Sequence, residues 1–303
     1  MRGQVLWGSN TIFYVQEGLT GAGGTVYECR IKGKKLAVVG EEYNPLAPGD
    51  LVDFEPEGAN HGMIASRVDR GRSIARWNKK RNAAQILACN LDLLVVVSCV
   101  ESPPFRPRFI DRCLIAANPS DVPVLIVVNK VDLGISDEDG ERILHYRRLG
   151  YEICLTSTAL GEGIDELRQR LDGQLAAFIG QSGVGKSSLL RALDPSLDAR
   201  VGYISAKYNR GTHTTVLAKT YLVPFARGII DTPGIRQLEL TAMSSREIAL
   251  AFPDFEPYHG QCGLYNCIHQ SEPNCAVLKA VEDGRILPDR YESYSRILAG
   301  QGD

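Results

Sequence analysis

"GQSGVGKSS", residues 180–188, is the stretch from which the fold of this chain can be worked out. It contains the complete pattern G-x4-G-K-S, with Gly180, Gly185, Lys186 and Ser187 at the fixed positions. The apolar run LAAFIG before it predicts a buried strand, and the segment after it predicts a helix that stops at the next proline. A strand, a glycine-rich loop and a helix in this order predict a phosphate-binding loop rather than a plain turn.

Each residue type in this loop has a chemical reason. Gly183 and Gly185 lack a Cβ, so the backbone N–H groups can curl around phosphate oxygens, and the helix N-terminus adds partial positive charge. Lys186 reaches the β- and γ-phosphates, and the hydroxyl of Ser187 can ligate Mg²⁺. The predicted phosphate-binding residues are Gly180, Gln181, Ser182, Gly183, Val184, Gly185, Lys186, Ser187 and Ser188.

Two later segments supply the other parts of a phosphate site. In "IIDTPG", residues 229–234, Asp231 follows a buried strand and can hold the Mg²⁺ shell, while the N–H of Gly234 can sense the γ-phosphate. "NRGTHTT", residues 209–215, lies between the two motifs, where a loop that closes on Mg²⁺ belongs. We favour Thr215 as its magnesium ligand, with Thr214 as the alternative.

A base-reading motif comes earlier in the chain. "LIVVNKVDL" predicts a strand that ends in Asn129-Lys130-Val131-Asp132. In this pattern the aspartate accepts hydrogen bonds from guanine, the asparagine ties the base edge to the phosphate loop, and the lysine stem packs along the base. "TSTALGEG" follows the next predicted strand, and we expect backbone N–H groups at Ser157 and Thr158 to read the guanine O6, with Ser157 the main position.

The order of these motifs is rotated. A common GTPase runs from the phosphate loop through the switch threonine and DxxG to NKxD, whereas here NKxD comes first and DxxG last. Rotation preserves the sheet and its ligand-binding edge, because the old termini can be joined and a surface loop opened. Between residue 90 and about residue 240, continuous Val/Ile/Leu strands alternate with helices, which predicts a mostly parallel sheet with helices on both faces.

The N-terminal segment has a different pattern. Residues 1–76 contain about five short predicted strands separated by Gly, Pro and Asn turns, in the stretches TIFYVQ, GTVYECRIKG, KKLAVVG, DLVDFEPE and HGMIASRV. This predicts a small closed barrel of the oligonucleotide-binding (OB) type, and an SH3-like barrel fits the same pattern.

A basic run follows this predicted barrel. Residues 67–82 carry seven bases against one acid, Asp69, and Trp77 is available for stacking. A solvated linker is the simplest interpretation of such a run, but its place beside an OB-like barrel favours contact with RNA. The predicted RNA-binding residues are Arg67, Arg70, Arg72, Arg76, Lys79, Lys80 and Arg81.

The C-terminal segment predicts a helical metal-binding domain. A capping box at residues 244–247 opens a helix, and two further helical stretches close the chain. Between them lies C-x4-C-x-H-x5-C, whose three thiolates and one imidazole suit one structural, tetrahedral Zn²⁺ with no open position. The predicted ligands are Cys262, Cys267, His269 and Cys275, and the predicted core thiols are Cys29, Cys89, Cys99, Cys113 and Cys154.

Composition narrows the class of protein. A chain of 303 residues is too long for one ordinary core, and a net charge of −2 gives no overall reason to bind nucleic acid. The longest apolar runs are too short to span a bilayer, and the N-terminus lacks the apolar core of a signal peptide. We therefore expect a cytoplasmic protein with no membrane partner.

Taken together, these motifs resemble the RsgA (YjeQ/YloQ) family of GTPases of the small ribosomal subunit over nearly the whole chain. The resemblance implies an OB domain at 1–76, a circularly permuted GTPase domain at 77–238 and a zinc domain at 239–303. It implies slow hydrolysis of GTP with Mg²⁺, stimulation by the small (30S) subunit with its 16S rRNA, and action late in that subunit's maturation. We expect a monomer. One departure is Thr212, which stands where the family's switch motif usually has Arg.

The catalytic residues predicted are His213, Lys186 and Asp231. Ile235 occupies the position where Ras-like enzymes use Gln to orient water, so intrinsic hydrolysis should be slow. His213 is the candidate that replaces it, and a loop histidine that only contacts RNA or solvent is the equal alternative. Two other classes stay open, a P-loop kinase or ATPase acting on small molecules and a non-hydrolysing RNA-binding module gated by nucleotide.

Overall fold

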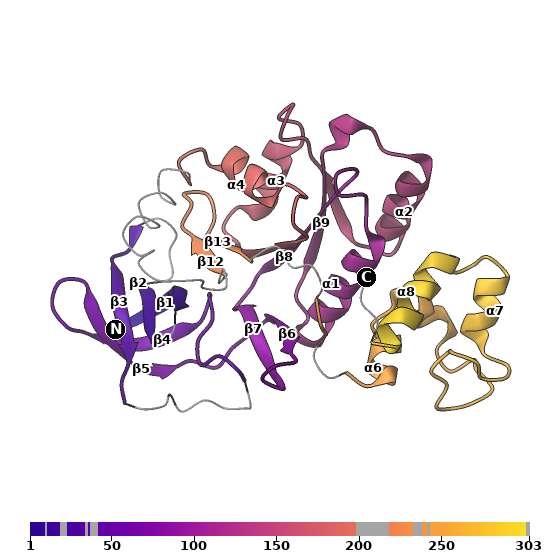
Figure 1. The fold of residues 1–303 in the computed structure, drawn as a ribbon, viewed down its shortest axis with the longest axis horizontal. Helices are drawn as coiled ribbons and strands as arrows, with labels where there is room; N and C mark the ends of the chain where they lie inside the picture. The colour runs from indigo at the N-terminus through magenta and orange to yellow at the C-terminus, as the bar shows by residue number, and fades with distance from the viewer. Residues whose placement is uncertain are drawn as a thin grey trace.

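The computed structural model describes residues 1–9, 11–18, 23–33, 36, 42–197, 218–232, 238–240 and 243–300. The molecule is elongated, with a small barrel at one end, a central sheet flanked by helices and a helical module at the other end (Figure 1). Within the described residues, no helix has both the length and the apolarity needed to cross a membrane.

The N-terminal barrel closes in the strand order β1-β2-β3-β5-β4. Its strands are β1 (Arg2–Ser9), β2 (Ile12–Glu17), β3 (Val26–Ile31), β4 (Leu51–Pro56) and β5 (His61–Arg67). Neighbouring strands are antiparallel except β3 and β5, which run parallel. The predicted barrel is therefore confirmed. The strand β1 was not predicted, whereas the predicted strand at 34–40 lies, apart from one residue, outside the described residues.

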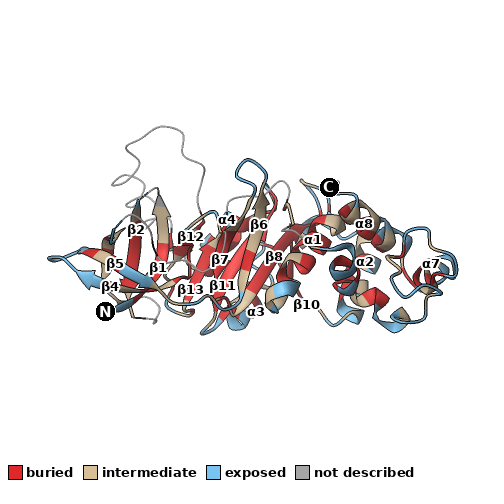
Figure 2. Cartoon of the chain, turned by 90° about the horizontal axis from the view of Figure 1, so that it is seen from below, coloured by how far each residue is buried: buried red, intermediate tan, exposed pale blue. Residues whose placement is uncertain are grey.

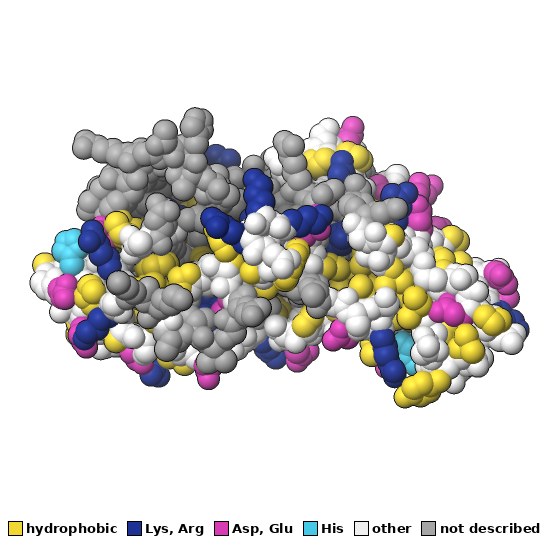
Figure 3. Space-filling view, turned by 60° about the horizontal axis from the view of Figure 1, so that its bottom comes forward, with side chains coloured by type: hydrophobic (Ala, Val, Ile, Leu, Met, Phe, Trp, Pro, Cys, Tyr) yellow, Lys and Arg dark blue, Asp and Glu magenta, His cyan; other side chains and the backbone are white. Residues whose placement is uncertain are grey.

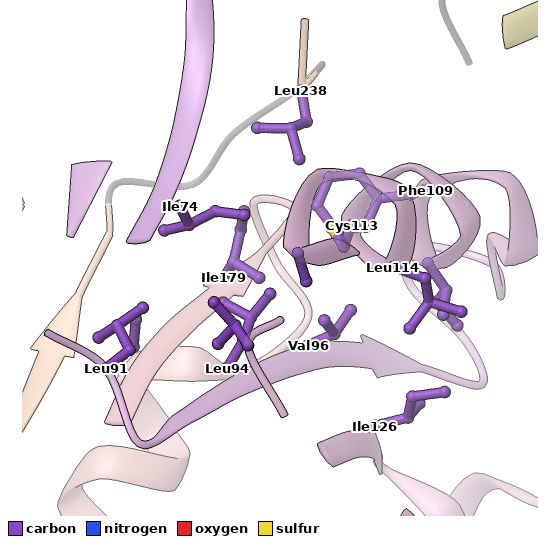
Figure 4. Packing of buried hydrophobic residues seen from close by; sticks show 14 of the residues in the cluster. Ile74, Leu91, Leu94, Val96, Phe109, Cys113, Leu114, Ile126, Ile179 and Leu238 are labelled. Atoms are coloured by element: carbon purple, nitrogen blue, oxygen red, sulfur yellow. The ribbon is translucent and has the colours of Figure 1, made fainter. Parts of the chain in front are cut away.

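A hairpin follows the barrel, in the basic run where the sequence predicted no strands. Strands β6 (Ser73–Asn78) and β7 (Ala83–Cys89) form a two-stranded antiparallel sheet. Ile74 is fully buried and packs with the residues of the central core, as Figure 4 shows. The expected barrel boundary at residue 76 thus falls inside β6, although the barrel strands end at Arg67.

The central sheet has six strands in the order β10-β9-β8-β11-β13-β12. All neighbouring pairs are parallel except the edge strand β12, which is antiparallel to β13. This confirms the mostly parallel sheet and places the strand of the phosphate loop, β11, at its centre. The strands are β8 (Leu93–Cys99), β9 (Val124–Asn129), β10 (Glu152–Leu155), β11 (Leu175–Gly180), β12 (Lys219–Tyr221) and β13 (Gly228–Asp231).

Helices cover both faces of this sheet, since successive strand residues point to opposite sides. Leu94 and Val96 pack in one core with Phe109, while Val95 and Val97 pack in the other. The first core includes helices α1 (Pro107–Ala117) and α2 (Asp137–Arg148), and the second includes α3 (Ile164–Leu171) and α4 (Lys186–Leu193). The strands are accordingly buried along most of their length (Figure 2). The five cysteines predicted as core thiols are all buried.

The C-terminal module consists of α6 (Ser245–Leu250), the 3-10 helix η4 (Pro253–Tyr258), α7 (Ala276–Glu282) and α8 (Pro288–Leu298). The predicted capping box is present, because Ser244 and Glu247 bond to each other's backbone N–H. Phe252, Phe255 and Tyr294 pack with ring centroids 4.8–5.3 Å apart and form the centre of this module's core.

A buried ion network joins this module to the central domain. Arg290 of α8, 2% exposed, pairs with Asp254 of η4 at 2.5 Å and with Asp111 of α1. Arg142 of α2 pairs with Asp111 at 3.1 Å, and His145, also of α2, meets Asp254 at 2.6 Å. Four elements thus meet in one mostly buried network of ionisable side chains.

Candidate functional site

The carboxyl ends of the parallel strands bring the predicted motifs together. The base-reading tetrapeptide follows β9, the 156–163 loop follows β10, the phosphate loop follows β11, and Asp231 ends β13. Because parallel strands all point the same way, these segments share one edge of the sheet, where open α/β sheets bind their ligands. The motifs are scattered over about a hundred residues of sequence, yet the sheet gathers them into one site.

The phosphate loop depends on its glycines. Gly183 and Gly185 have φ angles of +87° and +97°, which favour glycine. A Cβ on Gly185 would lie 2.2 Å from Nδ2 of Asn129, and one on Gly180 would lie 2.5 Å from the carbonyl oxygen of Val97. The loop therefore needs glycine both for its backbone conformation and for the close approach of the base-reading strand.

Lys186 and Asp231 form the charged centre of the site. Nζ of Lys186 donates to the carbonyl oxygen of Gly180, the first residue of the phosphate loop, at 2.8 Å. Burial lowers the pKa of Lys186 in spite of the attraction of Asp231. Burial also raises the pKa of Asp231 to about 6, an effect that Lys186 partly offsets. Both groups are therefore pushed toward their neutral forms when they have only each other.

The surroundings of Asp231 fit a magnesium ion. Its Oδ1 is buried and has no hydrogen-bond partner among the described residues. A carboxylate oxygen and the exposed hydroxyl of Ser187 are hard oxygen donors, which Mg²⁺ prefers when it also binds phosphates. A dication here would replace the missing partner of Oδ1 and favour the charged carboxylate.

The base-reading loop is held in place by its neighbours. Asn129 is fully buried, its Nδ2 donates to the carbonyl oxygen of Val184 at 3.0 Å, and its Oδ1 accepts from Thr156 Oγ1 at 3.2 Å. This is the tie between base loop and phosphate loop that the sequence predicted. Lys130 has a φ of +62°, and its ammonium donates to the carbonyl oxygens of Glu101 and Ser102.

Ser157 has a different task from the expected one. Its hydroxyl donates to a carboxylate oxygen of Asp132, and it also accepts from the N–H of Leu160 at 3.1 Å. Its own N–H donates to the carbonyl oxygen of Glu162 at 3.0 Å. The expectation that this N–H reads guanine O6 is therefore corrected, since the N–H is already bonded inside the loop. The Ser157 hydroxyl instead holds the Asp132 carboxylate.

Several expected residues cannot be placed. His213, Thr214, Thr215, Gly234 and Ile235 all lie outside the residues that the structure describes.

The basic run is divided by the fold. The side chains of Arg67 and Arg70 are each 6% exposed, and both pair with Glu42, while Arg70 also pairs with the buried Asp50 at 2.7 Å. The prediction that these two arginines contact RNA is corrected, because their charges are neutralised within the barrel region.

The other five bases remain at or near the surface. Lys79, Lys80 and Arg81 form the turn of the β6–β7 hairpin, where Lys79 meets Glu239 at 2.8 Å and Arg81 lies over the ring of Tyr43. Arg72 and Arg76 are on or beside β6, nearer the barrel. Lys and Arg side chains gather near the middle of the face seen in Figure 3.

A second site lies in the C-terminal module. One donor atom from each of Cys262, Cys267, His269 and Cys275 lies within 4.8 Å of all the others. Nδ1 of His269 is 3.4–3.5 Å from the three sulfurs. A tetrahedral zinc ion with ordinary bond lengths requires N···S edges of about 3.5 Å, so the four residues fit Zn²⁺. This agrees with the predicted ligand set.

Two features of the site were not predicted. The carbonyls that hold Lys130 belong to the loop after β8, and backbone groups leave no signature in residue type. The ion network behind α2 joins residues up to 179 positions apart, such as Asp111 and Arg290. An arginine on a helix pattern is normally a solvated residue, so only the fold reveals that this one is buried.

Known proteins resemble this chain closely. The model of the family described as RsgA GTPase matches residues 67–241. A small ribosomal subunit biogenesis GTPase RsgA from Borrelia recurrentis (strain A1) is 38% identical over 98% of this chain and 93% of its own length. The protein of that description from Moorella thermoacetica is 37% identical over 99% of this chain and 97% of its own.

Solved structures give the same picture. YjeQ from Thermotoga maritima superposes with a TM-score of 0.73 at 27% identity and covers 98% of this chain and 97% of its own. YloQ, described as a circularly permuted GTPase, superposes with a TM-score of 0.69 at 27% identity and covers 98% of this chain and 93% of its own.

Proposed function

Because this chain belongs to the RsgA GTPase family, with a circularly permuted G domain, we propose that it hydrolyses GTP while bound to the small (30S) ribosomal subunit, late in that subunit's assembly. The observation that supports this most is the hydrogen bond from Asn129 to Val184, since it joins a guanine-reading motif to a phosphate loop that follows it in the chain. Full-length relatives whose names include small-subunit biogenesis support the choice of partner.

The proposed roles follow from the geometry of the site. Asp132, held by Ser157, accepts hydrogen bonds from the guanine N1–H and amino groups. The stem of Lys130 lies along the base, because its ammonium is anchored beyond the site. Lys186 balances charge on the β- and γ-phosphates. The proposed GTP-binding residues are Asn129, Lys130, Val131, Asp132, Ser157, Thr158, the phosphate loop from Gly180 to Ser188, and Gly234.

Magnesium and zinc have separate roles in this proposal. Ser187, Asp231 and Thr215 would hold the Mg²⁺ that accompanies GTP, and the ion would supply positive charge to the phosphate oxygens. His213 orients the attacking water in place of the glutamine of Ras-like enzymes. The zinc cluster is structural, since all four positions of a tetrahedral ion are taken by protein ligands.

The proposed RNA interface is smaller than the sequence indicated. We assign it to Arg72, Arg76, Lys79, Lys80 and Arg81, of which the last three form an exposed turn. Exposed cations next to a closed barrel can neutralise phosphates of 16S rRNA with little desolvation cost. The proposed functional units are accordingly the barrel up to Arg67, the G domain from β6 onward, and the zinc module.

The direct test measures steady-state GTP turnover by the zinc-loaded protein with and without purified small subunits. We expect slow turnover alone and a rise of at least about tenfold with subunits, as a partner completes the site. Large subunits serve as the control and should have no effect. Equal turnover in all three conditions would contradict the proposal.

Base preference tests the reading of the nucleotide site. Asp132→Asn should weaken GTP binding by about 100-fold and bring a gain for XTP, because the amide can donate to the carbonyl that replaces the guanine amino group. Competition binding with GTP, XTP and ATP measures this change. If the variant showed no shift in preference from GTP to XTP, the result would support a kinase or ATPase with no specific guanine site.

A further inference from the structure

A cavity lies at the opposite end of the sheet from the nucleotide site. It has a volume of about 340 Å³ and is lined by residues of the barrel, of the segments before β6 and β13, and of the amino ends of β8 and β11. Asp92 directly precedes β8 and Leu175 begins β11, whereas the phosphate loop follows the other end of β11. The cavity is therefore separated from the GTP site by the length of a buried strand.

Hydrogen bonds from three segments fix the walls of this cavity. Nδ2 of Asn90 donates to the carbonyl oxygen of Gly49 at 2.8 Å, and its Oδ1 accepts from the N–H of Gly71 at 2.8 Å. Asp92 accepts from the N–H of Leu175 at 2.7 Å. The barrel, the connection to β6 and the sheet are thus tied together around the cavity. Hydrogen bonds therefore hold the segments that line the cavity in fixed positions.

Two arginines from different segments face this space. The side chains of Arg72 and Arg227 are 46% and 40% exposed. Both are therefore partly buried and partly accessible to a ligand in the cavity. Among the described residues, the ion-pair partner of Arg72 is the fully exposed Asp121, at 3.8 Å, and such a pair contributes little. Arg227 meets Asp92 at 3.4 Å, and its Nε is buried with no hydrogen-bond partner among the described residues. One lining carboxylate thus balances two guanidinium groups.

We propose that this junction cavity binds one phosphate-bearing nucleotide unit, at a site distinct from the GTP site. Two guanidinium groups lining one cavity are suited to phosphate oxygens, because a guanidinium fork can bind such oxygens bidentately. The volume is at the lower end of the range of about 300–1,000 Å³ for ligand pockets, which suits a single nucleotide and excludes a folded oligonucleotide. Leu51 and Leu91 give the sugar or base an apolar wall.

The nucleotide can come from two sources with the same chemistry. It can be a free mononucleotide, or one nucleotide of a single RNA strand. Arg72 lies one residue before β6, whose hairpin carries the proposed RNA-binding residues, so a strand following the hairpin would pass the mouth of the cavity. The proposal does not depend on the GTPase assignment, because the lining residues and the GTP-binding residues do not overlap.

The test uses the full-length, zinc-loaded protein saturated with GDP and Mg²⁺, so that the guanine site is filled. Calorimetry measures binding of CMP and, separately, of a five-nucleotide oligocytidylate. The double substitution Arg72→Gln and Arg227→Gln should weaken whichever probe binds by at least about tenfold, since two charge-assisted contacts are removed. Arg285→Gln is the matched control, because Arg285 also forms a partly exposed Asp pair but lies in the C-terminal module.

Each outcome decides the proposal. Binding of CMP that the double variant loses supports a free nucleotide. Loss confined to the oligonucleotide supports an RNA source if Arg227→Gln alone reproduces it, because Arg72 also belongs to the proposed RNA interface whereas Arg227 does not. If neither probe binds the wild type, or if binding is unchanged in the double variant, the cavity is a water-filled packing defect and the proposal fails. Arg72→Gln alone repeats the test if the double variant is unfolded, since the only described ion-pair partner of Arg72 is an exposed carboxylate. Intact GDP affinity in the variants separates this failure from a failure of the GTPase assignment.

Discussion

At the scale of single residues, the nucleotide site contains a carboxylate, Asp231, whose burial disfavours its charged form. The pKa of Asp231 rises to about 6 because burial disfavours the carboxylate, so the free native protein binds this proton more tightly than the unfolded chain does. Between the ordinary carboxyl pKa near 4 and the raised value near 6, the stability contributed by Asp231 therefore falls as pH rises. Mg²⁺ with GTP should reverse this effect by favouring the charged form.

We predict that Asp231→Asn stabilises the nucleotide-free protein by about 1–3 kcal/mol at pH 7.5, because the amide carries no buried charge. The same change should remove the Mg²⁺ dependence of GTP binding. Thermal unfolding at pH 5 and pH 7.5 measures the first effect, and GTP titration with Mg²⁺ or EDTA measures the second. A variant less stable than wild type at pH 7.5 would show that the carboxylate is already compensated in the free protein.

At the scale of elements, the fold divides the basic run into two parts, a buried pair of arginines before the β6–β7 hairpin and an exposed turn within it. Arg67 and Arg70 precede the hairpin, and their ion pairs with Glu42 and Asp50 join residues 20 to 28 positions apart in sequence. That pairing depends on where the fold places Glu42 and Asp50, so no local pattern could predict it. The hairpin itself was obscured because β6, SIARWN, is short, half of its residues are polar, and it has a bulge against β7.

We predict that Lys79→Ala, Lys80→Ala and Arg81→Ala together weaken binding to small subunits by about tenfold or more at moderate salt, since each removes a phosphate contact. GDP affinity should not change. Sedimentation with subunits at two salt concentrations measures the loss, and the salt dependence should become shallower. The control is Arg296→Ala on α8, a partly exposed base paired within its own helix. Equal loss in the control would mean that overall charge, and not the hairpin, controls binding.

At the scale of the whole molecule, the ion network connects helix α8 of the C-terminal module to helices α1 and α2 of the G domain. Burial alone would raise the pKa of Asp254, but hydrogen bonds from His145 and Arg290 lower it well below its usual range. This contribution to stability is present above the unfolded pKa near 4 and is lost as pH falls below it. Acid should therefore loosen the contact between α8 and the helices α1 and α2.

We predict that Arg290→Met lowers the free energy of unfolding by about 3–5 kcal/mol, because Asp111 and Asp254 are left buried without their cation. Denaturant unfolding measures the loss, and hydrogen exchange should locate increased opening in α2 and α8. Arg285→Met is the surface control and should change stability by less than about 0.5 kcal/mol. If Arg290→Met unfolded like the wild type, water would have to reach the network.

The sequence predicted most of the fold and of the nucleotide site, because both rest on local patterns. Loops such as residues 180–188 sit at strand ends whose position follows from apolar runs. Contacts between side chains that are distant in the chain could not be predicted from the sequence. The hydroxyl of Ser157 on Asp132 and the charges around Arg290 depend on how loops and helices meet, which residue type alone does not specify.

The rotated strand order also has a consequence for synthesis on the ribosome. Strands β8, β9 and β10 are consecutive in the chain and adjacent in the sheet, so they can pair while β11 is still being translated. The nascent chain would then carry the base-reading loop with an open edge on β8, before any phosphate loop exists. A GTPase with the common order emerges the other way round. In this protein, nucleotide affinity should appear only when β11 docks beside β8.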